Sequence, residues 1–151
     1  MKSQDFKGFP KESIRFFEQL TLNNDKIWFE KHKEEYNQLV LLPARQFIFE
    51  MGNVLKKSIP GIIADARVNR SIFKIHRDVR FSKDKSPFKI HLGVWFWEGH
   101  GKRMECSGFY FHVEPKLFLL GAGVHLLPQE FLLEFRNSLI QLNIKILSIL
   151  S

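Results

Sequence analysis

The stretch that decides the fold is Phe88-Lys-Ile-His-Leu-Gly-Val-Trp-Phe-Trp97. Every second side chain is apolar: Phe88, Ile90, Leu92, Val94 and Phe96. The side chains between them are mixed in character: Lys89, His91, Gly93, Trp95 and Trp97. Successive side chains of a strand point to opposite faces, so this period of two predicts a β-strand with one face toward a core. The mixed face is then where we look for a functional site.

Other segments with the same alternation predict a sheet around this strand. In 107–114 the apolar set is Phe109, Phe111 and Val113, and the polar set is Tyr110, His112 and Glu114. Further candidate strands are 62–66, 117–125 and 71–77, the last with Phe73 and Ile75 on one face. The polar turn 82–87 suits an antiparallel connection. We therefore predict a four- to five-stranded, largely antiparallel sheet.

Helical spacing is confined to the two ends of the chain. Apolar residues three or four apart predict helices over 11–22, over 28–39 with Asn23 or Asn24 as its cap, and from Pro43 onward. A last helix is predicted after Pro128. N-terminal helices, then a sheet, then a C-terminal helix indicate the α+β class, and 151 residues suit a single domain over 1–151.

Composition narrows the class of protein and of partner. The net charge of +7 favours anionic partners. A single cysteine, Cys106, excludes an intrachain disulfide and suits a reducing compartment. The N-terminus has no apolar stretch typical of a secretory signal, and no run approaches the ~20 apolar residues of a membrane span. We predict a cytoplasmic protein without a membrane span.

Positive charge is concentrated in 71–91. Its cations are Lys74, Arg77, Arg80, Lys83, Lys85 and Lys89, and its carboxylates are Asp78 and Asp84. Like charges at this density repel one another unless carboxylates or a bound anion neutralise them. The segment is therefore the first candidate for a binding site.

Polar side chains of three predicted strands fall on one face of the sheet. They are Lys74, His76 and Asp78, then Lys89 and His91, then Tyr110, His112 and Glu114. Trp95 and Trp97 share that face, so we expect a helix to cover part of it and leave a pocket.

The favoured interpretation is an anion-binding pocket. Arg77 and Arg80 would bind a phosphate or carboxylate in bidentate fashion, Lys83, Lys85 and Lys89 would add charge, and Ser82 a hydroxyl. The candidate catalytic residues are His91, Tyr110 and His112, because they can exchange protons. The partner would be a small anionic molecule.

Two alternatives stay open. The same cations would also follow a nucleic-acid backbone, with aromatic side chains stacking on bases. Alternatively, Asp78 and Asp84 pair with the neighbouring cations and simply hold a structural hairpin in shape. We expect no metal site, because the histidines near strand positions form no His-x-His or His-x-x-x-His pair. The sequence identifies no cofactor and leaves open whether the protein is an enzyme.

Several motifs occur in the order found in one protein family. They are Phe9-Pro10, Asn23-Asn24-x-x-x-Trp28-Phe29, Ser71-Ile72-Phe73, Arg77-Asp78-x-Arg80-Phe81-Ser82-Lys83-Asp84-Lys85-x-Pro87, Tyr110-x-His112-x-Glu114-Pro115 and Gly121-x-Gly123. Through these motifs, nearly the whole chain resembles the bacterial and fungal family called domain of unknown function 2461. The resemblance implies an α+β domain and supplies no activity.

The chain departs from that family in two ways. His76 and Phe88 stand where relatives tend to have tyrosine, and Lys74 where they tend to have arginine, which weakens any role for His76. Relatives usually continue beyond the last helix, so the chain resembles a C-terminally shortened member. We expect an uncovered sheet in such a member to promote self-association.

Overall fold

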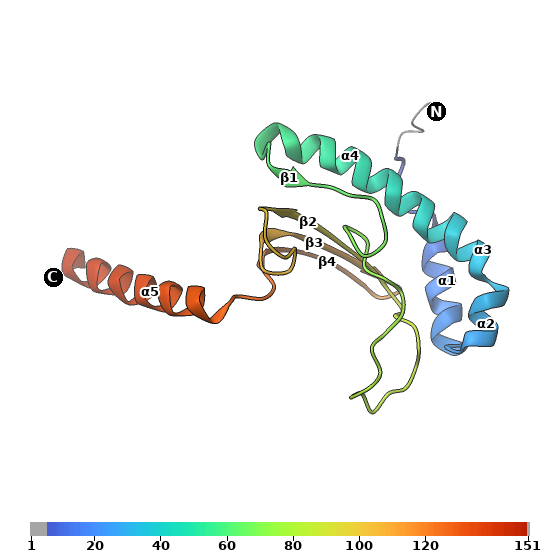
Figure 1. Ribbon diagram of the computed structural model, residues 1–151. Coiled ribbons are helices and arrows are strands. Elements are labelled where there is room, and N and C mark those ends of the chain that lie inside the picture. The colour runs from blue at the N-terminus through green and yellow to red at the C-terminus, as the bar shows by residue number, and fades with distance from the viewer. Residues whose placement is uncertain (1–5, 151) are drawn as a thin grey trace.

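A computed structural model describes residues 6–150, with side chains except those of residues 130 and 143–150 (Figure 1). The order of elements is α1 (Lys11–Leu22), α2 (Lys26–Lys31), α3 (Lys33–Tyr36), a π-helical turn η1 (Asn37–Leu41), α4 (Leu42–Ser58), β1 (Ile62–Ile63), β2 (Leu92–Glu98), β3 (Ser107–Glu114), β4 (Leu117–Val124) and α5 (Gln129–Leu150). N-terminal helices, a sheet and a C-terminal helix confirm the predicted α+β class.

The four strands form one antiparallel sheet in the order β1-β2-β3-β4. In the register of β2 and β3, Val94 pairs with Phe111 and Gly93 pairs with His112. Val94 and Phe111 are buried in the core, whereas His112 lies on the opposite face. The alternation predicted for these two strands is therefore confirmed.

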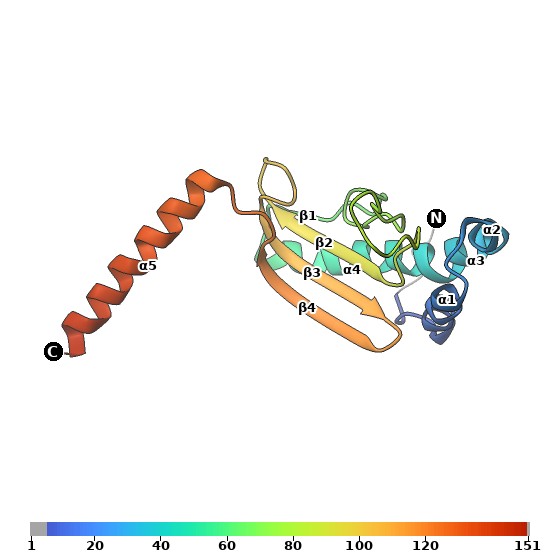
Figure 2. The same cartoon turned by 90° about the horizontal axis from the view of Figure 1, so that it is seen from below.

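The apolar face of the sheet packs on the helices, with α4 running along it (Figure 2). Phe16 and Leu20 of α1 and Phe47 and Ile48 of α4 are buried in this core. Burying a large apolar side chain contributes about 1.5–3 kcal/mol, so this helix–sheet interface is the main source of stability. Aromatic rings fill much of it; Phe47 and Phe111, for example, have centroids 4.6 Å apart.

The predicted strand over 71–77 is wrong. The segment makes isolated bridges, Ile72 with Val94 and His76 with Phe88, rather than a continuous ladder. Ile72 and Ile75 are both buried in the core, three residues apart, which a regular strand does not allow on one face. Phe73 therefore lies on the opposite face from Ile75, contrary to the sequence-based assignment.

The turn between α1 and α2 also differs from the prediction. Asp25, not an asparagine, caps α2, because its carboxylate accepts a hydrogen bond from the Trp28 amide at 2.9 Å. Asn24 instead forms two hydrogen bonds with the backbone of Phe88, at 2.9 and 3.0 Å. These bonds fix the segment that leads into β2 against the helical layer.

Loops, rather than the predicted helix, cover the polar face at Trp95 and Trp97. The Trp95 indole donates to the Arg103 carbonyl at 2.9 Å, and the Arg70 guanidinium lies 5.6 Å from the Trp97 ring centre. The loop that carries Arg103 follows β2, and the segment that carries Arg70 leads into β2, so both reach these two rings. The indole hydrogen bond satisfies the polar end of a buried side chain.

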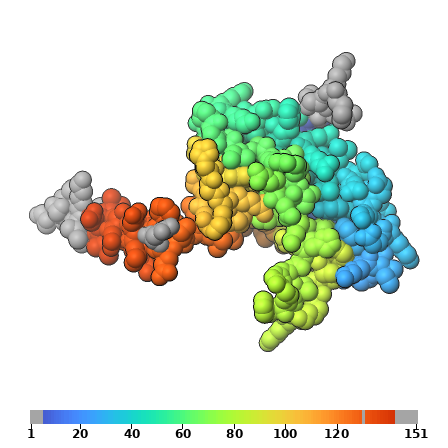
Figure 3. All heavy atoms as spheres, in the orientation of Figure 1, coloured from blue at the N-terminus to red at the C-terminus, as the bar shows by residue number. Residues whose placement is uncertain are grey.

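The last helix, α5, extends away from the sheet (Figures 1 and 2). The space-filling view shows the coloured part of α5 and the hairpin around residues 77–87 as two projections from the body (Figure 3). Among the described residues, no helix is both long and apolar enough to cross a bilayer.

Candidate binding pocket on the polar face of the sheet

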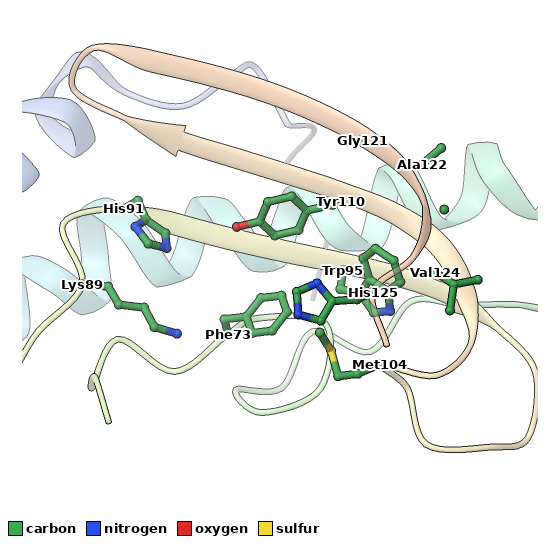
Figure 4. A pocket seen from close by; sticks show the side chains of 11 residues that line it. Phe73, Lys89, His91, Trp95, Met104, Tyr110, Gly121, Ala122, Val124 and His125 are labelled. Atoms are coloured by element: carbon green, nitrogen blue, oxygen red, sulfur yellow. The ribbon is translucent and has the colours of Figure 1, made fainter. Parts of the chain in front are cut away.

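A pocket of about 390 Å³ opens on the polar face of the sheet. Its walls come from all three long strands, from the segment before β2 and from two loops; the lining residues are Phe73, Lys89, His91, Trp95, Met104, Tyr110, Gly121, Ala122, Gly123, Val124 and His125. Lys89 and His91 lie at one end, and Trp95, Met104 and His125 at the other, with Tyr110 and Phe73 between them (Figure 4).

Gly93 makes room for the central pair. A Cβ atom at this position would lie 3.0 Å from the Tyr110 hydroxyl oxygen and 3.1 Å from a ring carbon of Phe73. Both distances are tighter than ordinary van der Waals contact. The glycine therefore allows Tyr110 and Phe73 to meet edge to face, with ring centres 6.0 Å apart.

A chain of hydrogen bonds runs along β3. The Tyr110 hydroxyl lies 3.0 Å from Nδ1 of His112, and Nε2 of His112 lies 3.2 Å from Oε2 of Glu114. An ionised carboxylate only accepts, so Nε2 carries the imidazole proton and Nδ1 accepts from the tyrosine. Burial first, and then the charge of Glu114, raises the pKa of Tyr110, which keeps the phenol protonated.

His91 lies beside this chain. Its ring stacks on His112 with centres 4.3 Å apart. Burial, helped by the nearby His112 and Lys89, lowers the pKa of His91 to about 4. The imidazole is therefore neutral near pH 7 and can accept a proton or a metal ion.

Two cations lie over the Phe73 ring. Lys89 Nζ is 5.5 Å and the Arg103 guanidinium carbon 4.8 Å from its centre. Burial lowers the pKa of Lys89, and the positive charges of Lys74 and Arg103 lower it further. Among the described residues, no carboxylate forms a salt bridge with Lys89 or Arg103. The pocket thus has an unneutralised positive end.

Arg103 was missed by the sequence analysis. It comes from the loop between β2 and β3, and its guanidinium also donates to the Arg70 carbonyl. No periodicity marks a loop residue, so the sequence holds no signal for this contact.

In the basic hairpin, by contrast, both arginines have carboxylate partners. Arg77 pairs with Asp84, and Arg80 pairs with Asp78 at 2.6 Å. Hydrogen bonding from Arg80 lowers the pKa of Asp78 to about 2, and hydrogen bonds from Ser86 and then Arg77 lower that of Asp84. These pairs agree with the structural-hairpin alternative.

The predicted binding residues therefore separate into two groups. Lys89 lines the pocket with His91 and Tyr110, and His112 contacts both of these side chains without lining the pocket. Arg80, Ser82, Lys83 and Lys85 lie along the hairpin instead. Lys85 donates to the Val79 carbonyl at 3.0 Å, and Lys83 is exposed. Arg77, at the hairpin base, lines a second hollow of about 390 Å³ that also contains Lys89 and His91.

The fold also brings together three side chains able to hold a metal ion. One donor atom each from His91, His112 and Glu114 lies within 4.8 Å of the others. His91 comes close because Gly93, two residues later, pairs with His112. The sequence holds one signal for this cluster, His112 and Glu114, which are two residues apart on one face of a strand. The prediction of no metal site rested on pairs of histidines alone and so did not include it.

Comparisons with known proteins place the chain in a family without assigning it an activity. Residues 12–151 match the family described as conserved hypothetical protein (DUF2461). Searches of curated proteins and of solved structures found no match. Because the family match covers nearly the whole sequence, the chain belongs to the DUF2461 family.

Proposed function

We propose that the pocket on the polar sheet face binds a small organic anion with a flat apolar body. The observation that supports this most directly is Lys89: its ammonium group is half-buried, lies over Phe73, and has no carboxylate partner among the described residues. Phe73, Trp95 and Met104 offer apolar walls for the rest of such a molecule.

Electrostatics favours this pocket over the hairpin. Burial and neighbouring positive charges both penalise the ammonium of Lys89, and a bound anion would offset both penalties. Arg77 and Arg80 already have carboxylate partners, so an incoming anion would have to displace Asp84 or Asp78. We therefore place the anionic group at Lys89 and Arg103.

Proton transfer to or from the bound molecule is the chemistry that we propose for His91, Tyr110 and His112. The neutral ring of His91 can accept a proton, and the Tyr110 oxygen, which donates to His112, keeps its lone pairs for a ligand donor. Glu114 holds the tautomer of His112. Of these groups, His91 lies beside Lys89 at one end of the pocket, and Tyr110 lies between that end and the apolar end (Figure 4).

Isothermal titration with phenyl phosphate, benzoate and inorganic phosphate tests the proposal. We expect the two aromatic anions to bind more tightly than inorganic phosphate, and Lys89→Gln to weaken them at least tenfold because the buried charge is lost. Lys83→Gln, on the exposed hairpin, is the matched control and should bind like the wild type. Equal affinity in Lys89→Gln and wild type would refute the assignment.

Nucleic-acid binding is the second candidate, favoured only by the net charge of +7. Trp95 and Trp97 are both buried and are not free to stack on bases. Titration of single-stranded and duplex oligonucleotides at two salt concentrations decides it. A steep salt dependence that Arg80→Ala and Lys83→Ala each reduce would favour nucleic acid over the small anion.

We also propose that the chain self-associates through β4 and α5. β4 is an edge strand, and apolar side chains on it and on α5 are exposed, among them Leu120 at 68% and Phe131 at 53%. An apolar edge strand is self-complementary, so a second copy is the occupant that fits it.

Finally, the single, half-buried Cys106 supports a reducing compartment, and we propose the cytoplasm.

A further inference from the structure

We propose that His91, His112 and Glu114 form a binding site for a divalent transition-metal ion such as Zn²⁺ or Fe²⁺. The inference goes beyond anion binding and does not depend on it, because Lys89 is not one of the three ligands. With the ion bound, His91 and His112 would act as ligands in place of the proton-transfer role proposed above. Two imidazoles and one carboxylate are a donor set typical of zinc enzymes and of non-haem iron enzymes, in which three protein ligands leave a position for water or substrate.

The spacing of the donor atoms fits one small ion. Bonds of about 2.0–2.1 Å at tetrahedral angles place two ligand atoms roughly 3.3 Å apart. Nε2 of His112 and Oε2 of Glu114 are already 3.2 Å apart, and the three donor atoms lie within 4.8 Å of one another. An ion would replace the proton that these two atoms now share, and His91 would turn out of its stack on His112 to complete the set.

The surroundings of His112 supply the second shell. A histidine that binds a metal through one nitrogen usually donates its other N–H to a fixed acceptor. When Nε2 binds the ion, the ring proton resides on Nδ1, and Tyr110 Oη lies 3.0 Å away to accept it. Tyr110 would then orient the ligand ring without touching the metal.

All three ligands are partly buried, and the sheet fixes the backbones of two of them. His112 and Glu114 belong to β3, in which His112 pairs with Gly93 of β2 and Glu114 pairs with Leu117 of β4. His91 precedes β2 directly and lines the pocket, so an ion bound to it would lie at the Lys89 end of that pocket. An open coordination position there is accessible to a small molecule.

Equilibrium dialysis of the metal-stripped protein against Zn²⁺ tests the site, with bound Co²⁺ as a spectroscopic probe of coordination. We expect one ion per chain and at least a 30-fold loss of affinity in Glu114→Gln, which keeps the size of the side chain and its capacity for hydrogen bonds. Tyr110→Phe should cost 10- to 100-fold, typical of a lost second-shell partner. His125→Ala, at the far end of the same pocket, is the matched control and should bind normally.

The outcomes separate this proposal from anion binding. Lys89→Gln should lose phenyl phosphate yet bind Zn²⁺ at least as tightly as wild type, because a neighbouring positive charge is removed. Circular dichroism checks each variant, and His91→Ala decides the question if Glu114→Gln does not fold. Absence of Zn²⁺ binding by the wild type at about 1 mM, or unchanged binding in His91→Ala, would overturn the proposal.

Discussion

Single side chains fix the irregular segment that precedes β2. Asp65 accepts hydrogen bonds from Arg67 Nη2 at 2.6 Å and from Arg70 Nε at 3.0 Å, and its own amide bonds the hydroxyl of the buried Ser71. The first of these contacts is the main reason that the pKa of Asp65 is well below its usual range. The cluster orients Arg70 over Trp97 and so helps to close the polar face.

We expect Asp65→Asn to lower the free energy of unfolding by about 1 kcal/mol at pH 7, since it removes a partly buried carboxylate shared by two guanidinium groups. A group whose pKa is lowered by folding stabilises the protein above its unfolded pKa of about 3.9, and the contribution is lost as the pH falls through the folded value. Urea denaturation at pH 7 and pH 3 should therefore show a smaller difference between variant and wild type at pH 3. Glu12→Gln, in an exposed pair, should change little at either pH.

Residue types predicted some of these roles and misplaced others. An asparagine at position 24 is a good helix cap in isolation, but the adjacent Asp25 serves equally well. The choice between these two residues is made by the backbone of Phe88, 64 residues away, because Phe88 holds Asn24 in a hydrogen bond. Local preference alone does not contain that information.

At the scale of elements, one hydroxyl compensates for a proline within the helical layer. Pro43 has no N–H, so the Leu39 carbonyl lacks the amide that would bond to it in an α-helix. The hydroxyl of Ser13, a residue 1% exposed on α1, donates to that carbonyl instead. The π-helical turn η1 lies at the same point, where the helical hydrogen-bond pattern is interrupted.

We expect Ser13→Ala to cost about 1–3 kcal/mol, because it leaves the Leu39 carbonyl without its side-chain donor in a partly buried place. Thermal or urea denaturation measures the effect. Thr21→Ala is the matched control: its hydroxyl also bonds a carbonyl, that of Phe17, but within a regular helix turn. A loss in Ser13→Ala no larger than in Thr21→Ala would contradict the assigned role.

Periodicity predicted the regular elements and failed where the chain is irregular. The strand 107–114 was predicted with its observed bounds, and the strand predicted over 88–97 forms over 92–98, because the alternation extends over many residues. Segment 71–77 looked alike in sequence, yet Ile72 and Ile75 both enter the core while hydrogen bonds join only parts of the segment to β2. A short segment can turn between such contacts, so tertiary packing overrides its local pattern.

For the molecule as a whole, the exposed apolar surface of β4 and α5 has a measurable consequence. We expect light scattering to show a mass above that of the 17.9 kDa monomer, increasing with concentration. Leu120→Glu should shift the equilibrium toward the monomer. Phe81→Glu, at a side chain 95% exposed on the separate hairpin, should not. A monomer at all concentrations would refute association through this surface.

The candidate site was predictable in part at this scale. Alternation placed Tyr110, His112 and Glu114 on one face and His91 on the neighbouring strand, and the structure assembles all four. The charge count pointed instead to the hairpin, because a sum over sequence does not show which acids pair with which bases. The second cation near the pocket, Arg103, comes from a loop, and only folding brings its guanidinium over Phe73.

The alternation of β3 has a consequence for how the site can change by mutation. The same register buries Phe111 and aligns Tyr110 with His112, so one inserted residue within this strand would reverse both sides at once. An insertion there could not remove the site without also breaking the core. A point mutation at Tyr110 or His112, by contrast, deletes one polar group and spares the scaffold, so descendants that abandon the proposed function should differ at those codons and not in strand length.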